Sequence, residues 1–253
     1  MTLMVSGQSA AYCGPPARPD GLWSAWNTDP WLIAALIVLA VAGGALAVRR
    51  GAQAGKRNPA LPGAWLIAFA LFVTPLCAMS VALFSMRAVN HLILVAVLAP
   101  LLAYGLGARR FSGWLGPAAI VHAVLFWFWH APAPYAAALG HDGIYWLMQL
   151  SLLGSAVWFW SALMARWNDI VATAGTLAGF AAQMGLLGAL IAFAPDPLYA
   201  PHAVTTAAWG ITALEDQQLA GLIMWVPGVL PYLIALGLAV AAALSRSGET
   251  AAR

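Results

Sequence analysis

Five histidines carry most of the metal-ligand chemistry that this sequence offers: His91, His122, His130, His141 and His202. Imidazole binds transition metals and gains or loses a proton near neutral pH. Four of the five fall at or beyond the ends of apolar segments, and all lie away from the clusters of basic residues. Histidines gathered at one membrane face are therefore candidates for metal binding or proton handling.

Arg87 and His91 are four residues apart, so they share one face if this stretch is helical, with Met86 next to Arg87. We expect both at the outer edge of a membrane span, where they bind a ligand together or anchor the helix at the interface. His122 lies about two turns before His130 in an apolar stretch. A polar ring there needs a hydrogen-bond partner or a ligand.

Imidazole and sulfur ligands together favour Cu(I). The predicted metal ligands are His91, His130, His122, Met86, Asp216 and Met224. Methionine is also an ordinary core residue, so each methionine alone is a weak signal. Cys13 and Cys77 have no CxxC spacing and predict no disulfide framework, and Cys13 is left open as a ligand or a bystander.

A second polar stretch, Glu215-Asp216-Gln217-Gln218, runs directly into an apolar segment that contains Pro227 and Pro231. Charges and amides at the mouth of a membrane helix predict a site rich in partners on one aqueous side. Asp216 either touches a metal or caps this helix. The two prolines each remove a backbone donor and predict a bend.

The composition excludes a soluble fold, because 63% of the residues are hydrophobic and only 8% are charged. We predict an all-α fold with seven transmembrane helices in a single membrane domain, residues 1–253. The predicted spans cover residues 30–48, 63–84, 89–106, 114–131, 144–164, 170–194 and 219–244. Pro75 and Pro100 should bend their helices. Gly175 and Gly179, followed by Gly185 and Gly188, should allow close approach of the sixth span to a neighbour.

The basic residues predict the orientation, because they follow the odd-numbered spans. They are Arg49, Arg50, Lys56, Arg57, Arg109, Arg110, Arg166, Arg246 and Arg253. These loops should be cytoplasmic, which places the N-terminus outside and the C-terminus inside. Segment 1–29 is then periplasmic and tail 246–253 cytoplasmic. Topology accounts for the net charge of +3, so no nucleic-acid partner is predicted.

The sequence lacks the residues that several classes of membrane protein and enzyme need. A retinal protein needs a lysine within a helix, and the only lysine, Lys56, falls in a loop. The sequence has no HExxH pair, GxSxG elbow or phosphate-binding loop, so we predict no enzyme. A haem with two histidine ligands needs deep histidines on facing helices, and only His122 is clearly deep.

Four stretches of the sequence resemble the multi-pass CtaG family of cytochrome c oxidase assembly proteins, which is distinct from the single-pass copper chaperone that shares the label. They are Trp26-Asn27-Thr28-Asp29-Pro30, His91-Leu92-Ile93-Leu94 with Ala99-Pro100-Leu101-Leu102, Trp129-His130-Ala131-Pro132 with Tyr135, and the stretch from Asp216 to Gly228. The fourth stretch is long and specific. Together the four run over most of the chain in the expected order.

The resemblance implies a seven-span protein of the bacterial inner (plasma) membrane that helps to mature a haem-copper oxidase by supplying or positioning copper on the periplasmic side. It implies oxidase subunits as partners, with periplasmic copper chaperones as further candidates. The functional positions carry over to His91, His130, Asp216 and Gln217; Trp129 and Arg87 lie beside them. The family often has an HMxxH pair, and its first histidine falls here at Arg87. A metal would then need His91 with His130, His122 or a methionine.

Two alternatives remain open from the sequence. Buried polar groups and broken helices mark transport paths, so His122, Pro75, Pro100 and Pro227 fit a transporter of copper or another small solute. A haem-binding membrane redox protein is the other alternative, and it predicts a Soret band in the purified protein.

Overall fold

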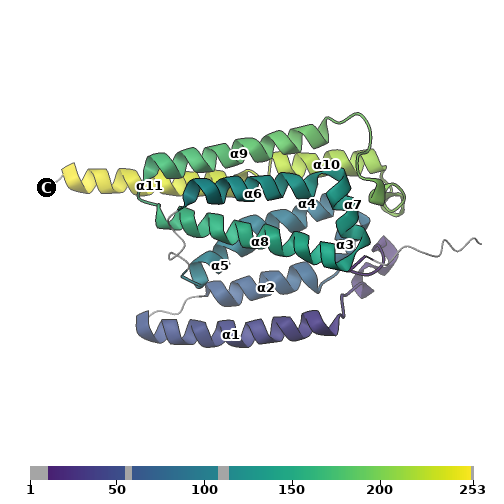
Figure 1. Cartoon of the computed structure of the whole chain (residues 1–253), viewed down its shortest axis with the longest axis horizontal. Coiled ribbons are helices and arrows are strands. Elements are labelled where there is room, and N and C mark those ends of the chain that lie inside the picture. The colour runs from purple at the N-terminus through teal and green to yellow at the C-terminus, as the bar shows by residue number, and fades with distance from the viewer. Residues whose placement is uncertain (1–10, 55–58, 108–113, 252–253) are drawn as a thin grey trace, which may run out of the picture.

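The computed structural model describes residues 11–54, 59–107 and 114–251, and this part of the chain is a bundle of helices without strands (Figure 1). The helices are α1 (Pro30–Ala54), α2 (Ala60–Phe72), α3 (Leu76–Ala82), α4 (Phe84–Ile93), α5 (Ala99–Gly105), α6 (Leu115–His130), α7 (Pro132–Gly140), α8 (Asp142–Ala165), α9 (Ile170–Ala192), α10 (Ala213–Trp225) and α11 (Leu230–Ala251). Short helical turns are η1 (Pro19–Ser24), η2 (Leu94–Leu98), η4 (Ala200–His202) and η5 (Thr206–Trp209). The predicted all-α class is confirmed.

Several helices are long and apolar enough to cross a membrane. Five segments qualify within the described residues: Pro30–Arg49, Phe84–Gly105, Asp142–Ala165, Ile170–Ala192 and Ala213–Ser247. Helices α2 and α3 make a sixth if they count as one span bent by 44°. Helix α6 has 16 residues, fewer than the roughly 20 that a span needs. The membrane class is therefore supported, while the count of seven and the orientation stay predictions.

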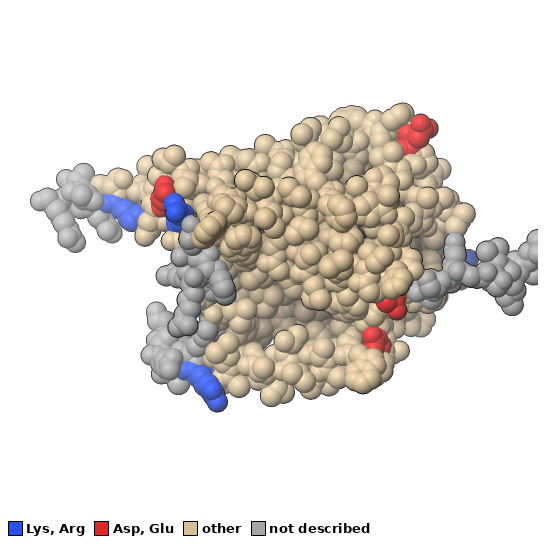
Figure 2. Space-filling model, viewed as in Figure 1, with Lys and Arg blue, Asp and Glu red and all other residues tan. Residues whose placement is uncertain are grey.

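The charged side chains lie at the two ends of the bundle, and the broad surface between them carries none in this view (Figure 2). A surface without charge suits the hydrocarbon layer of a bilayer. The side chains of six residues from the predicted cytoplasmic set lie outside the described part of the chain: Arg50, Lys56, Arg57, Arg109, Arg110 and Arg253.

The bend predicted at Pro75 is confirmed, and the bends predicted at Pro100, Pro227 and Pro231 stay predictions. Pro75 follows the end of α2 and precedes α3, and the axis turns by 44° there. Pro100 falls in the first turn of α5, directly after the π-helical stretch Leu94–Leu98. A wide π-turn relieves the clash that proline makes inside a helix. Pro227 lies in the break between α10 and α11.

Helices α9 and α10 touch through glycines. A Cβ atom built on Gly188 would lie 2.7 Å from the Gly221 carbonyl oxygen, and one on Gly221 would lie 2.5 Å from the Ala192 nitrogen. Only glycine fits at such distances. A Cβ on Gly175 or Gly179 would meet nothing within 4 Å. The predicted close approach of this span is confirmed at Gly188, not at the GxxxG pair.

A disulfide between Cys13 and Cys77 ties the segment before α1 to α3, with the Cα atoms 5.3 Å apart. The expectation of no disulfide was wrong, because the chain brings together two cysteines that are 64 residues apart. Cys13 is therefore a disulfide partner and not a free thiolate. We call the end of the bundle that carries this disulfide, together with α3, α7 and η4, the disulfide end (Figure 1).

A tyrosine and a carboxylate fasten the start of α1 at the same end. The Tyr12 hydroxyl donates a hydrogen bond to Asp29, and the Asn27 nitrogen donates to the Val73 carbonyl at 2.9 Å. The bond from Tyr12 lowers the pKa of the Asp29 carboxyl. Burial and the same bond raise the pKa of Tyr12. The disulfide end is thus fixed by covalent and polar contacts.

Candidate functional site

The carboxylate of Asp216, on α10, caps the N-terminus of α4. Leu83 precedes α4 and offers no side-chain acceptor. Asp216 accepts hydrogen bonds from the Phe84 nitrogen at 2.6 Å, the Ser85 nitrogen at 3.2 Å and the Ser85 hydroxyl at 2.5 Å. The first backbone donors of a helix lack partners within it, and a negative charge also stabilises that end. Asp216 therefore fixes α4, which carries Arg87 and His91.

Helix α10 has its own local cap. The Thr212 hydroxyl accepts from the Glu215 nitrogen at 3.1 Å, and Glu215 accepts from the Thr212 nitrogen at 2.7 Å. This reciprocal pair is a capping box. Because Thr212 and Glu215 already cap the N-terminus of α10, the carboxylate of Asp216 is available to cap α4. The sequence left open whether Asp216 binds a metal or caps its own span; in the structure it caps α4 instead.

The structure brings His91 and His130 together from α4 and α6. The His91 Nδ1 and His130 Nε2 atoms are 3.5 Å apart, and the two rings meet edge to face at 84°. The His130 Nδ1 lies 2.6 Å from the Phe126 carbonyl oxygen. A carbonyl only accepts, so Nδ1 of His130 carries the proton and Nε2 presents a lone pair to His91. Both rings are buried.

Arg87 lies one turn before His91 on α4 and is 1% exposed. Its guanidinium carbon lies 5.3 Å from the centre of the Tyr145 ring, a cation–π contact. Within the described part of the chain, the Nε and Nη1 atoms have no hydrogen-bond partner. The predicted interfacial anchor is therefore wrong: Arg87 is a buried cation inside the bundle.

A chain of hydrogen bonds from α7 to η4 closes the site beside Arg87. The Tyr135 hydroxyl and the His202 Nε2 are 2.7 Å apart, and the His202 Nδ1 is 3.2 Å from the Ala82 carbonyl oxygen. His202 therefore donates from Nδ1 to Ala82 and accepts from Tyr135 at Nε2. The Tyr199 hydroxyl donates to the His130 carbonyl at 2.7 Å. These contacts join the loop before α10 to α3, α6 and α7.

Burial governs the protonation of this hydrogen-bonded chain. Burial lowers the pKa of His202 to about 4, and the charge of Arg87 acts in the same direction, against the hydrogen bond to Ala82. Burial also raises the pKa of Tyr135, and that of Tyr199. His202 is therefore neutral and both tyrosines stay protonated at neutral pH.

Gln217 and Trp129 hold neighbouring elements in place. The Gln217 Oε1 accepts from the Leu198 nitrogen at 2.6 Å, and its Nε2 donates to the carbonyl oxygens of Ile191 and Asp196 at 3.3 Å. Gln217 thereby fastens the end of α9 and the following loop to α10. The Trp129 Nε1 donates to the Ser151 hydroxyl at 2.9 Å and links α6 to α8.

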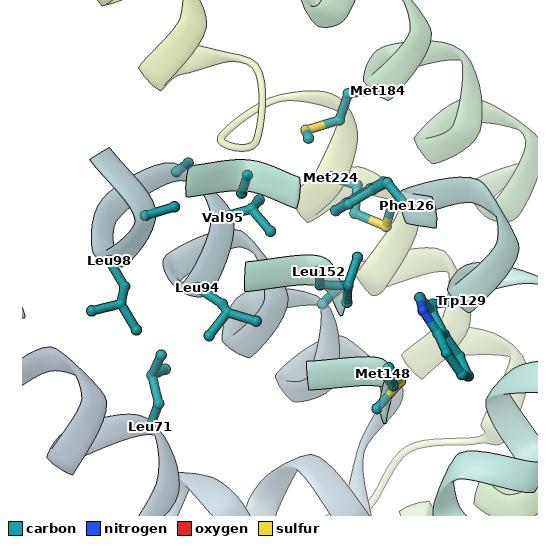
Figure 3. Packing of buried hydrophobic residues seen from close by; sticks show 14 of the residues in the cluster. Leu71, Leu94, Val95, Leu98, Phe126, Trp129, Met148, Leu152, Met184 and Met224 are labelled. Atoms are coloured by element: carbon teal, nitrogen blue, oxygen red, sulfur yellow. The ribbon is translucent and has the colours of Figure 1, made fainter. Parts of the chain in front are cut away.

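The other predicted ligands lie apart from the histidine pair or pack as core residues. His122 is paired with the Ser155 hydroxyl at 2.9 Å, and eight residues of helix place it about 12 Å along α6 from His130. Met224 is fully buried in an apolar cluster with Phe126 and Met148 (Figure 3). Met86 is half-buried. Among the described residues, no group of three or more His, Cys, Asp or Glu side chains could hold a metal ion.

Sequence reasoning missed three partners of the predicted site. Tyr145, His202 and Tyr199 contact Arg87, Tyr135 and His130 respectively, and none of the three was among the predicted metal ligands. His202 carried a signal, since it was among the histidines expected on the outer side. The tyrosines carried none, because their contacts join residues 58 to 69 positions apart.

Comparison with known proteins agrees with the resemblance seen in the sequence. Residues 108–246, more than half of the chain, match the family model described as cytochrome c oxidase caa3 assembly factor (Caa3_CtaG). The matched range includes His130, Asp216 and Gln217, while Arg87 and His91 precede it. No curated protein and no solved structure matches the chain. The chain therefore belongs to the Caa3_CtaG family of cytochrome c oxidase assembly factors.

Proposed function

We propose that this membrane assembly factor holds Cu(I) as a transient cargo between His91 and His130 and presents it to a haem-copper oxidase. Family membership carries the assembly role. The observation that carries the copper role is the pair of imidazole nitrogens that face each other 3.5 Å apart in the buried part of the bundle.

The separation of the two nitrogens suits a shared metal better than a hydrogen bond. Hydrogen bonds of this kind are usually about 2.9 to 3.0 Å long. If imidazole nitrogens lie about 2.0 to 2.1 Å from a metal, a 3.5 Å separation corresponds to an angle of about 120° at the ion. The Phe126 carbonyl fixes the ring of His130, as second-shell acceptors do for metal-binding histidines. His91 would bind through Nδ1, with its proton on Nε2.

The charge of the surroundings favours a monovalent ion. Arg87 lies one turn from His91, and its positive charge opposes a divalent cation more than Cu(I). Asp216 is the only carboxylate among the predicted ligands, and it already accepts hydrogen bonds from the first residues of α4. Imidazole is a common copper ligand, and both ligands here are imidazoles. The positive charge of Arg87 also weakens the binding of Cu(I), and a site that passes its metal on must be able to release it.

The disulfide supports the proposed orientation. Disulfides persist in oxidising compartments such as the bacterial periplasm. The Cys13–Cys77 bridge lies at the end that also carries His202 and Tyr135. We therefore propose that the disulfide end faces the periplasm of the inner membrane, where oxidase subunits and copper chaperones would dock.

A Cu(I) competition titration tests the copper role. The purified wild-type protein should bind one Cu(I) per chain, and the His91→Ala, His130→Ala double variant should lose at least 100-fold in affinity. His141→Asn is the matched control: it removes an exposed histidine and keeps a side chain that can cap α8. The copper content of the oxidase in cells should fall with the double variant and stay normal with His141→Asn. A folded double variant with normal Cu(I) affinity and normal oxidase copper content would refute the copper-binding role. Docking of the oxidase would then remain as the function of the site.

The two alternatives predict different outcomes. A copper transporter would carry labelled copper into proteoliposomes, whereas a cargo site gives no uptake. A haem protein would show a Soret band. The rings of His91 and His130 already contact each other, so a porphyrin does not fit between them.

A further inference from the structure

A cavity of about 590 Å³ lies between α1 and the face formed by α2, α5 and α8. Its walls are leucine, alanine and aromatic side chains, with the amide of Gln149 as the polar exception. The Trp65 indole nitrogen in this wall already donates to the Leu36 carbonyl at 2.7 Å. We infer that the cavity binds one long-chain lipid with a neutral hydroxyl head, and that Gln149 holds the head.

Gln149 carries the argument for a polar head. The side chain is 1% exposed, and neither its Oε1 nor its Nε2 has a hydrogen-bond partner within the described residues. An amide buried without partners is costly. A hydroxyl group donates one hydrogen bond and accepts others, so a single hydroxyl can satisfy both ends of this amide.

The depth of Gln149 excludes a charged head. Gln149 lies seven residues after Asp142, where α8 begins, which is about 10 Å along the helix axis. A charged or zwitterionic head is costly at that depth in a membrane. The ligand must therefore be neutral, which separates it from the surrounding phospholipids.

The shape of the cavity fits a single extended chain. Its wall follows α1 from Leu32 to Leu46, 14 residues or about 21 Å of helix. The volume lies in the usual range of ligand sites, about 300 to 1,000 Å³. The apolar wall suits an isoprenoid or alkyl chain and offers that chain no further hydrogen bond.

Helix α1 gives such a lipid a way in from the bilayer. It lies at the edge of the bundle and packs mainly on α2 (Figure 1). Among its described side chains, only Leu32 and Leu36 are buried. A helix held by so little buried apolar surface can move away from the rest of the bundle at low cost. The site is thus open to a ligand dissolved in the membrane and is independent of the histidine pair.

Native mass spectrometry of the detergent-purified protein tests the inference, with geranylgeraniol and its methyl ether as probes. The ether keeps the chain and loses the donor. Wild type should bind one geranylgeraniol per chain and the ether about tenfold more weakly, since one buried hydrogen bond is lost. Gln149→Leu should bind both probes alike. Ala68→Phe fills the cavity and should bind neither, while Ala182→Phe, on the outer face of α9, should match wild type.

Circular dichroism of each variant checks that it is folded. Equal binding of the two probes by wild type would overturn the role of Gln149. Binding retained by a folded Ala68→Phe variant would overturn the site itself, as would a phosphatidylcholine adduct in place of geranylgeraniol.

Discussion

Replacing Asp216 with alanine tests whether this carboxylate is a helix cap or a metal ligand. The variant leaves the Phe84 and Ser85 nitrogens buried without an acceptor. Each unsatisfied donor costs about 1 to 3 kcal/mol, or about 2 to 6 kcal/mol together. The Ser85 hydroxyl can turn to another acceptor, and loss of a buried carboxylate offsets part of the cost. We expect a net loss of about 3 kcal/mol in the free energy of unfolding.

Thermal unfolding in detergent measures the loss. For a chain of this size, 1 kcal/mol corresponds to about 2 to 4 °C, so Asp216→Ala should lower the unfolding temperature by about 6 to 12 °C. Asp216→Asn keeps an oxygen for the Phe84 nitrogen and turns an NH₂ group toward the Ser85 nitrogen. The Asp216→Asn variant should lose about half as much free energy of unfolding as Asp216→Ala. Ser85→Ala removes one of the three contacts, and a double-mutant cycle with Asp216→Ala should give a coupling energy above 0.5 kcal/mol.

The Cu(I) affinity of the same variants separates the two roles. A cap acts on α4 as a whole, so folded Asp216→Asn should bind Cu(I) within about tenfold of wild type. An Asp216→Ala variant that unfolds at the wild-type temperature and loses Cu(I) binding would refute the cap and make the carboxylate a ligand.

Three further predictions follow from the described contacts. Replacing Cys13 and Cys77 with alanine should cost at most about 4 kcal/mol, from closure of the 64-residue loop, and chemical reduction of wild type should lower the unfolding temperature equally. The pKa of His202 is about 4 in the folded protein and about 6.5 in the unfolded chain. The free energy of unfolding should therefore fall by about 1.4 kcal/mol per pH unit as the pH drops from 6.5 toward 4. In acid unfolding curves, His202→Gln should reduce this slope. Gly221→Ala should destabilise by about 1 to 3 kcal/mol in thermal unfolding, while Gly179→Ala should not.

The sequence predicted those features that depend on nearby residues. Hydropathy is a local average, so the apolar helices, the helical class and the break at Pro75 could be read directly. The spacing of Arg87 and His91 placed both on one helix face. The resemblance then supplied His130 and Asp216, which composition alone could not select.

Contacts between distant residues could not be read in the same way. Asp216 meets Ser85 across 131 residues, and Cys13 meets Cys77 across 64. Propensity rules assign a cap to the nearest helix start, which is why one of the two roles considered for Asp216 was a cap of its own helix. The actual cap depends on how α10 packs beside α4, and that packing depends on Gly188 and the other contacts that set the position of α10.

Arg87 is the clearest case of a residue whose role depends on packing. Counting charges along the chain placed it at the interface, where a guanidinium stays in water at little cost. In the fold it is 1% exposed, and the Tyr145 ring provides only a cation–π contact. Among the described residues no carboxylate forms an ion pair with Arg87, and a buried charge without a counterion costs several kcal/mol of stability. Arg87 lies one turn before His91 on α4, and its charge lowers the pKa of His202, so the buried guanidinium favours the neutral form of that imidazole.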